Sequence, residues 1–288
     1  MSILEASVST NAIAVAQALS ISVAKDKGGV GGSLVAQGTA EVFRYRGGKE
    51  FTVAVLDGDA TTHTTMSRLG ERDARGDFLE QQSIAGGVVG FDLTDRDQAG
   101  TVIDIAELQV PLIVMDTPAG GLARFATLTE NLNGRDVVQA HQSQGRKVAI
   151  FVPITPMLAS VGNVRAAMDC FGDDVQYVVV RNLYGCDSSS FTLWDERDFR
   201  DAWGRVVSGS SKERLLAAGG RIIDLPALNA GVVAKMDALG LSAVASRAHE
   251  RFSLSQRIAI TNWLRAWARE LDKVGDLLGL TGSLAEGW

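Results

Sequence analysis

The sequence predicts an α/β fold whose mostly parallel, twisted sheet is covered by helices on both faces. Short runs of apolar residues recur along the chain, and helix-like stretches of ordinary crossover length separate them. Strands that are apolar at every position are typical of parallel sheets buried on both faces. With 288 residues, of which 46% are hydrophobic and 22% charged, the chain is long enough for one large domain with an extensive core.

The N-terminal part is expected to contain a β-loop-α-β unit. A short helix rich in Ala and Gln is expected at 11–19, and a strand at 21–24 leads into charged residues and glycines. A helix at 34–45 and a strand at 51–56, rich in β-branched residues, follow. Four more buried strands are expected at 112–115, 148–152, 177–180 and 222–225.

The C-terminal region is predicted to form a long helix. Apolar residues recur at helical spacing from Arg257 to Leu278 and give this helix one apolar face. Its four basic and three acidic side chains make it less basic than membrane-surface helices usually are, so the preferred interpretation is contact with the body or a partner subunit, not with a membrane. We treat residues 1–288 as a single domain with a C-terminal helical extension at about 243–280.

Aromatic residues form a second pattern with helical spacing. Trp194, Phe199 and Trp203 recur in this way between Phe191 and Val207. Such residues could recognise a partner, but packing in the core or in an interface is the preferred interpretation.

Composition narrows the functional classes. The formal net charge of -6 does not indicate that the whole surface binds nucleic acid, although a local basic face could do so. Cys170, Cys186 and three scattered histidines lack the spacing of a metal cluster. The sequence shows neither a secretory signal nor an apolar run of membrane-spanning length, so a cytoplasmic location is expected.

The strongest functional signal is the segment Lys25-Asp26-Lys27-Gly28-Gly29-Val30-Gly31-Gly32-Ser33-Leu34, at a predicted passage from strand to helix. Amide N–H groups at such a passage converge on an anion, and glycines let the backbone approach phosphate oxygens closely. A serine at the start of the helix can bind Mg²⁺. The segment is therefore a candidate phosphate cradle, although a tight turn without a ligand would look similar.

Acidic residues at two later strand ends support this interpretation. Asp57 and Asp59 end the predicted strand at 51–56, and Asp116 ends the one at 112–115. Ligands of parallel sheets bind at the carboxyl ends of strands, where carboxylates can hold Mg²⁺-bound water or orient an attacking water. Each aspartate taken singly could instead be a helix N-cap or a loop residue. His63 lies close by, but nothing in the sequence pairs it with a nucleophile.

Together these residues resemble the ParA/MinD-type P-loop ATPases. The deviant Walker A motif of that family reads Lys-Gly-Gly-x-Gly-Lys-Ser/Thr, and strand-end Asp-x-Asp and Asp-Thr-Pro follow it, as they do here over about residues 21–226. The resemblance implies a P-loop NTPase-like fold that binds ATP and Mg²⁺. It also implies that Lys27 reaches phosphates across a nucleotide-sandwiched homodimer and that Asp59 positions the attacking water, which makes these two the catalytic candidates.

The resemblance further implies residues that bind the nucleotide and the metal. A strand-end asparagine would recognise the base, and a later proline-containing loop would pack beside it. The implied nucleotide-binding residues are Gly28, Gly29, Val30, Gly31, Gly32, Ser33, Asn182 and Pro226, and the implied metal-site residues are Ser33, Asp57 and Asp116. Within the group, Arg-Asn-Leu-Tyr-Gly at 181–185 and Leu-Pro-Ala-Leu at 225–228 are most similar to TraL/StbB-like proteins of conjugative transfer and plasmid stability.

The chain departs from the family pattern at position 32, where the family has a phosphate-binding lysine and this chain has Gly32. A lysine ammonium on phosphate is a charge-assisted contact worth about 1.5–3 kcal/mol in binding, and more where charge develops during reaction. Hydrolysis is therefore expected to be impaired, whereas weak ATP binding survives, and Gly32→Lys is expected to raise the affinity. Lys25 could turn inward and replace the missing charge, but a strand-end lysine is more often solvated.

A basic stretch lies near the C-terminus, where five arginines accompany one acidic residue between Ala243 and Arg269. It is either a DNA-backbone patch or an ordinary solvated helix face. The arginines are Arg247, Arg251, Arg257, Arg265 and Arg269.

Two functions stay open. The first is a nucleotide-dependent dimerising switch that acts with DNA or a cargo adaptor in partition, maintenance or conjugative transfer of plasmid DNA. The second is a nucleotide-independent adaptor that keeps the P-loop fold. The sequence decides neither whether ATP is hydrolysed nor which cargo or partner protein is bound.

Overall fold

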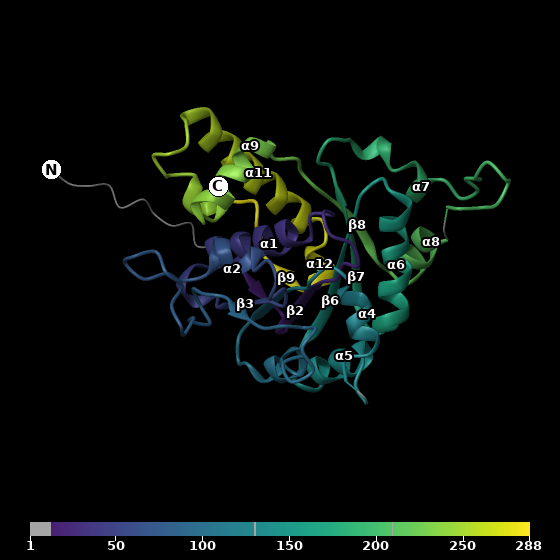
Figure 1. Ribbon diagram of the computed structural model, residues 1–288, viewed down its shortest axis with the longest axis horizontal. Coiled ribbons are helices and arrows are strands. Elements are labelled where there is room, and N and C mark those ends of the chain that lie inside the picture. Colours follow the sequence, from purple (N-terminus) through teal and green to yellow (C-terminus); the bar gives the residue numbers. More distant parts are fainter. Residues whose placement is uncertain (1–12, 130, 209) are drawn as a thin grey trace.

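The computed structural model describes residues 13–129, 131–208 and 210–288, and Figure 1 shows one large sheet with helices on both of its faces. Its strands are β2 Leu19–Val23, β3 Val53–Asp57, β4 Val89–Gly90, β5 Leu112–Asp116, β6 Lys147–Ile154, β7 Gln176–Asn182 and β8 Arg221–Leu225. They lie in the order β4-β3-β5-β2-β6-β7-β8, and every neighbouring pair is parallel. The predicted α/β class with a parallel sheet is confirmed.

Residues along each central strand alternate between two hydrophobic cores, one on each face of the sheet. In β5, Leu112 and Val114 belong to one core, whereas Ile113 and Met115 belong to the other. This alternation is the period of two that a strand requires. Because both faces are covered, the central strands are buried along their whole length and mostly apolar, which is the pattern that the sequence displays.

The first core takes residues from α1, α2, α9, α10, α11 and α12, and the second takes residues from α3 to α8. The helix bounds are α1 Gly32–Gly47, α2 Thr64–Leu69, α3 Thr101–Asp104, α4 Gly121–Ala126, α5 Gly134–Ser143, α6 Leu158–Phe171, α7 Thr192–Asp195, α8 Ser211–Ala217, α9 Ala230–Leu239, α10 Ala243–Ser246, α11 Leu254–Asp272 and α12 Gly275–Leu278. Within the described ranges, no helix has the length and apolar character needed to cross a membrane.

The helix predicted at 11–19 is wrong for the residues that the structure describes; residues 11 and 12 lie outside them. Strand β1, Ala14–Val15, pairs antiparallel with β9, Leu280–Thr281, and β2 begins at Leu19. Alanine and glutamine are good helix formers, but helix propensity is a small free-energy preference, and pairing with the distant C-terminal strand outweighs it. This pairing joins the start of the described chain to its end.

The predicted C-terminal helix is confirmed in its main part, α11, but it ends at Asp272, and the short α12 follows it. Its apolar face packs on the body, as preferred, since Trp263 and Trp267 are buried against the first core. The predicted helical spacing at 191–207 is wrong beyond α7. The chain turns there into a hairpin with a bridge between Arg200 and Val206, which leaves Trp203 80% exposed.

A glycine sets the distance between α1 and α11. A Cβ atom at Gly38 would lie 2.8 Å from Cη2 of Trp263 and 3.1 Å from Cδ1 of Trp267. Only a residue without a side chain lets these helices approach so closely, because both indoles are buried in a packed core.

We therefore expect Gly38→Leu to lower the free energy of unfolding by about 1–3 kcal/mol through overpacking. Urea denaturation would measure it. Gly162→Leu is the matched control, because Gly162 lies in α6 and a Cβ there meets nothing within 4 Å. It should keep or raise stability, by up to about 1 kcal/mol from helix propensity. Equal losses in the two variants would contradict the packing argument.

A buried glutamate connects α1 to α10. The Glu41 carboxylate accepts the N–H of Val244 at 2.8 Å. Burial raises the pKa of Glu41 above its ordinary value of 4.5, and hydrogen bonds from residues 242–244 oppose the rise only in part. The folded protein therefore holds this proton to a higher pH than the unfolded chain does.

Linkage then gives the sign of the pH dependence. The unfolded chain releases the proton near pH 4.5, so the contribution of Glu41 to stability falls as the pH rises above that value. Glu41→Gln keeps an acceptor for Val244 but cannot ionise. Its free energy of unfolding should increase relative to that of the wild type as the pH rises above about 4.5, as measured by denaturation at several pH values. A constant difference across this range would contradict the raised pKa.

Candidate functional site

The parallel register brings the predicted acidic residues to one edge of the sheet. In adjacent strands Asp57 pairs with Asp116, and Asp116 pairs with Val23. Val23 is the last residue of β2, and the chain passes from it through the glycine-rich loop into α1. The carboxyl ends of β3, β5 and β2 therefore meet beside the start of α1, where parallel α/β sheets bind ligands.

The glycine-rich loop has the geometry of an anion cradle. Gly29 and Gly31 have φ angles of 77° and 87°, a region that favours glycine. In the described part of the chain, no backbone or side-chain acceptor pairs with the amide N–H groups of residues 28–33. These donors lie at a helix N-terminus, where the partial positive charge also attracts an anion.

Lys25 lies inside the site, in contrast to the expected solvated lysine. Its side chain is 7% exposed, and its Nζ donates to Asp116 Oδ1 at 2.7 Å and to Ser33 Oγ at 2.9 Å. The chain runs over Gly32, where a Cβ atom would lie 2.4 Å from Cδ of Lys25. Lys25 thus occupies the space that a side chain at position 32 needs, and the expected gain in affinity from Gly32→Lys stays a prediction.

The two buried carboxylates are fixed by hydrogen bonds. Asp57 accepts the N–H groups of Asp59, Thr65 and Met66 at 3.1, 3.0 and 2.8 Å, and Asp116 accepts the hydroxyl of Thr65 at 2.8 Å. Burial, and then the charge of Asp116, raises the pKa of Asp57 to about 6. Asp57 therefore anchors the start of α2 to the sheet and brings Thr65 against Asp116.

Asp59 lies in the turn between β3 and α2 and is half-buried. Its carboxylate accepts the amide N–H groups of Thr61 and Thr62 and the hydroxyl of Thr62. His63 ends this turn with a φ of 45° and stays exposed. The predicted role of Asp59 in positioning water stays a prediction, since these bonds also suit a plain loop residue.

A cavity of about 390 Å³ lies beside the glycine-rich loop. Asn182 holds the loop, because its Nδ2 donates to Val30 O at 3.0 Å, and a Cβ at Gly31 would lie 2.4 Å from that nitrogen. Pro226 lies in the cavity wall, and its place beside a bound base stays a prediction. The lining residues are Gly29, Gly31, Leu34, Gln37, Thr64, Arg68, Asn182, Tyr184, Pro226, Leu228, Ala230, Val233, Ala234 and Asp237.

Arg68 is a member of this wall that sequence reasoning missed. It is buried and donates to Asp237 Oδ1 at 2.6 Å and to Gln37 Oε1 at 3.1 Å, which connects α2 to α9 and α1. Thr65 was missed as well. Neither belongs to a recognisable motif, and their only signal is their position on the first helix after the Asp-Gly-Asp turn.

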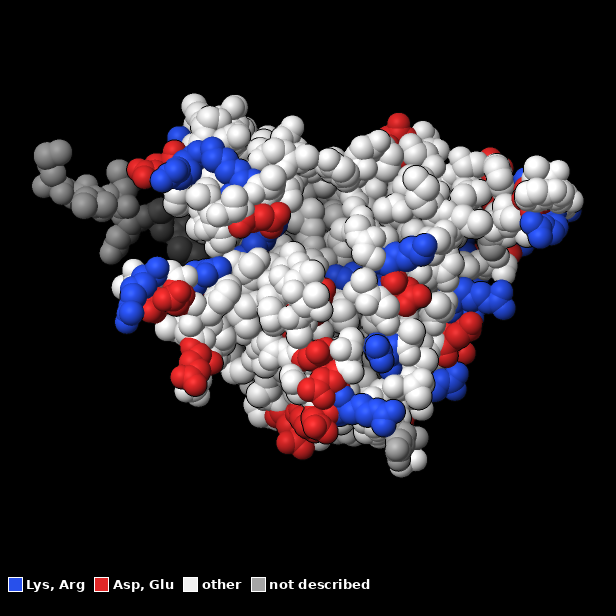
Figure 2. All heavy atoms as spheres, viewed as in Figure 1, with Lys and Arg blue, Asp and Glu red and all other residues white. Residues whose placement is uncertain are grey.

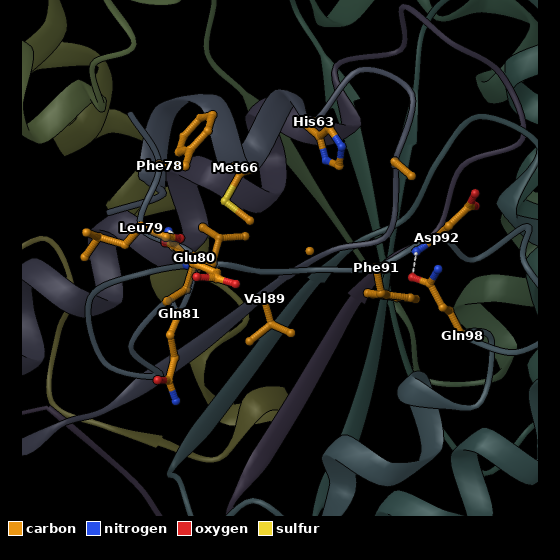
Figure 3. A pocket seen from close by; sticks show the side chains of 14 residues that line it. His63, Met66, Phe78, Leu79, Glu80, Gln81, Val89, Phe91, Asp92 and Gln98 are labelled. Carbon is orange, nitrogen blue, oxygen red and sulfur yellow. Dashed lines mark hydrogen bonds between the residues drawn. The ribbon is translucent and has the colours of Figure 1, made fainter. Parts of the chain in front are cut away.

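A larger cavity of about 620 Å³ lies on the other side of α2, which contributes Thr64 and Arg68 to the first cavity and Met66 to the second. Figure 3 shows Met66 and Phe78 on one side of this second cavity and Val89 and Phe91 near the edge strand β4. None of the residues 28–33 lines it, so this cavity is separate from the glycine-rich loop.

Lys27 is exposed, and in the described residues it makes no ion pair. It is thus free to reach outward from the loop, as a contact to a second subunit requires. The described residues contain no cluster of three or more His, Cys, Asp or Glu with metal-binding geometry.

A Mg²⁺ ion on a bound nucleotide would nevertheless find a suitable set of oxygens. Ser33 offers a hydroxyl in the first turn of α1, and Asp57 and Asp116 offer carboxylates at adjacent strand ends. Oxygen-only donors that supplement phosphate are the environment that Mg²⁺ prefers. Because Lys25 Nζ lies between Ser33 and Asp116, an ion bound to Ser33 requires this ammonium to move.

No protein-family model and no curated protein matches the chain. A solved structure of a ParA family ATPase from Chlorobium tepidum TLS matches 88% of this chain and 98% of its own, with a TM-score of 0.50 and 14% identity. A nucleotide-binding protein from Archaeoglobus fulgidus, in complex with ADP, matches 77% and 86% with a TM-score of 0.42 and 18% identity. Apo McdA from Cyanthece matches 85% and 99% with a TM-score of 0.43 and 11% identity.

At these identities the likeness concerns the fold, and the match to the Chlorobium protein extends over nearly the whole of both chains. It agrees with the parallel sheet and with the glycine-rich loop between β2 and α1. A special closeness to TraL/StbB-like proteins stays a prediction. The chain therefore has the fold of a ParA-family ATPase, as its sequence predicts.

Proposed function

We propose that this protein is an ATP-binding switch of the ParA type, in which Mg²⁺-ATP joins two copies of the chain. One observation carries the proposal: the unpaired amides of residues 28–33 open beside a cavity of about 390 Å³ whose wall contains Asn182 and Pro226. A cradle for phosphates next to a largely apolar cavity suits a nucleotide, because the base and the phosphates need these two environments.

Each group of residues at the site has its own proposed role. The amides of the loop would bind phosphate oxygens. Ser33 and the carboxylates of Asp57 and Asp116 would hold Mg²⁺, which supplies neutralisation of phosphate charge. Asp59, at the end of the same edge, orients the attacking water. With glycine at position 32, turnover depends on another cation close to the phosphates.

Dimerisation is the output of the proposed switch. Exposed Lys27 lies at the rim of the cradle, so its ammonium can reach phosphates bound by a facing subunit. We propose that the dimer binds DNA or a cargo adaptor in the partition, maintenance or conjugative transfer of plasmid DNA in the cytoplasm. The ParA-family fold supports a role of the partition type, and the TraL/StbB-like stretches at 181–185 and 225–228 support the link to mobile DNA.

The switch predicts that Mg²⁺-ATP binds and doubles the mass in solution, measured by calorimetry and light scattering with ADP as the control nucleotide. Lys27→Ala should weaken ATP-dependent dimerisation about tenfold or more, because a charge-assisted phosphate contact is lost, while the unfolding temperature stays unchanged. Lys212→Ala, which removes a lysine of α8, is the control. Full dimerisation of the Lys27 variant would exclude the sandwich arrangement.

A second function, a nucleotide-independent adaptor, is favoured by Gly32 alone. It predicts no binding at millimolar ATP and a constant mass. The cavity beside the unpaired amides favours the switch over the adaptor, because a nucleotide uses both together.

The proposed DNA contact concerns the five arginines near the C-terminus, and they are not equivalent. Arg265 donates to the carbonyl oxygen of Trp288 at 2.8 Å, and Arg247 lies over the rings of Tyr45 and Trp288 at 4.8 and 5.2 Å. These two hold the C-terminal residue. Arg251 and Arg269 are exposed and are the better candidates for phosphate contacts.

On the face that Figure 2 shows, basic and acidic side chains are interspersed, and the formal net charge of the chain is -6. A DNA contact therefore has to be local. We expect Arg251→Ala with Arg269→Ala to weaken DNA binding and to lower the slope of log affinity against log salt by about two, measured by fluorescence anisotropy at several salt concentrations.

The matched control removes two exposed arginines elsewhere, Arg75 and Arg165, whose side chains are 87% and 72% exposed. It lowers the net charge equally. If both double variants change the salt slope alike, the effect is one of net charge and the patch is not the DNA contact.

A further inference from the structure

Lys25 is a buried lysine that reaches the phosphate cradle from the sheet. It lies two residues beyond the end of β2, and its Nζ contacts Asp116 Oδ1 and Ser33 Oγ. In the described residues these are its two hydrogen-bond acceptors. An ammonium has three N–H donors, so one remains for a ligand.

We propose that Lys25 is the phosphate-binding lysine of this site and that it enters from the strand end, across Gly32, instead of rising from the first turn of the helix. The inference rests on the proposed nucleotide binding and adds a residue to it. Ser33 is the last residue of the cradle, so an ammonium within hydrogen-bond distance of its hydroxyl is already beside the amides that would bind the phosphates.

Gly32 leaves the space that the Lys25 side chain occupies. A Cβ at position 32 would lie 2.4 Å from Cδ, 3.2 Å from Cε and 3.1 Å from Nζ of Lys25. A contact of 2.4 Å is far inside van der Waals distance, so any side chain at position 32 has to displace Lys25. The absence of a side chain at position 32 leaves the space that the Lys25 side chain occupies. A side chain at position 32 and the observed conformation of Lys25 therefore exclude each other.

The competing structural role is that of a counter-ion. Asp116 is completely buried next to buried Asp57, and an unpaired charge there would be costly, so Lys25 could serve only to neutralise this pair. The two roles differ in one respect. If Asp116 is replaced by a neutral residue, no counter-ion is needed, but the lysine is still needed to bind phosphate.

The experiment measures ADP binding by calorimetry in EDTA, which separates the lysine from any effect of Mg²⁺ at Ser33 and Asp116. The wild type should bind, and Lys25→Met should bind about 10- to 100-fold more weakly. Lys25→Met with Asp116→Asn, in which the buried pair is removed as a whole, should stay equally weak. Adenosine should bind all three proteins alike, since it has no phosphate.

The exchange of positions gives the sharpest result. Lys25→Met with Gly32→Lys should recover most of the lost affinity, because the helix-borne lysine then has room. Gly32→Ala alone should weaken ADP binding by displacing Lys25, whereas Gly100→Ala, where a Cβ meets nothing within 4 Å, should not. Thermal unfolding of each variant checks that it is folded, and the two Lys25 double variants keep the test valid if Lys25→Met alone does not fold.

The failures are distinguishable. Absence of ADP and ATP binding to the wild type would overturn the proposed function itself. Wild-type binding that Lys25→Met leaves unchanged, or a return of full affinity in the variant that also carries Asp116→Asn, would leave the nucleotide site in place but show that Lys25 is not its phosphate ligand.

Discussion

The contact between Lys25 and Asp116 joins the two parts of the molecule on which the site depends, the end of β2 and the end of β5. Asp116 also accepts the hydroxyl of Thr65, and Asp57 fixes the backbone at Thr65. One connected set of polar groups therefore sets the positions of the glycine-rich loop, the start of α1 and the start of α2. Each of its members lies at a strand end or the first turn of a helix, and the parallel register brings them together.

Stability alone gives little reason for such a set. Removing two charges from water costs several kcal/mol each, and apolar residues of similar volume are often as stable or more stable in their place. The two carboxylates also disfavour each other's ionised form. Burial, and then the charge of Asp116, raises the pKa of Asp57 to about 6. A ligand that brings negative charge to the open amides changes this balance, because it offers Lys25 a new partner. Polar groups held in this way suit a site that changes on binding.

The fold could be predicted further than the site. Strands such as β5 are apolar at every position before the terminal Asp116, and this signal depends only on burial from both faces. Ala14 and Val15 gave no such signal, because their pairing with β9 depends on residues at the far end of the chain. The hairpin around Trp203 was missed for a similar reason, since aromatic spacing does not distinguish a helix from a turn. At the site, the motif located the cradle and the carboxylates, but the burial of Lys25 depends on space that opens only in three dimensions.

At position 32, the identity of the residue alone does not say whether the site has a phosphate-binding ammonium. The motif records which residue stands at each place in the chain, whereas binding depends on where the charge lies. A lysine on the first turn of α1 and a lysine beyond the end of β2 can deliver an ammonium to the same point, provided that only one of them is present. Lys25 follows β2, a strand that pairs with β5 on one side and with β6 on the other. Its ammonium is thus positioned by the core of the protein, while the loop only has to offer its amides.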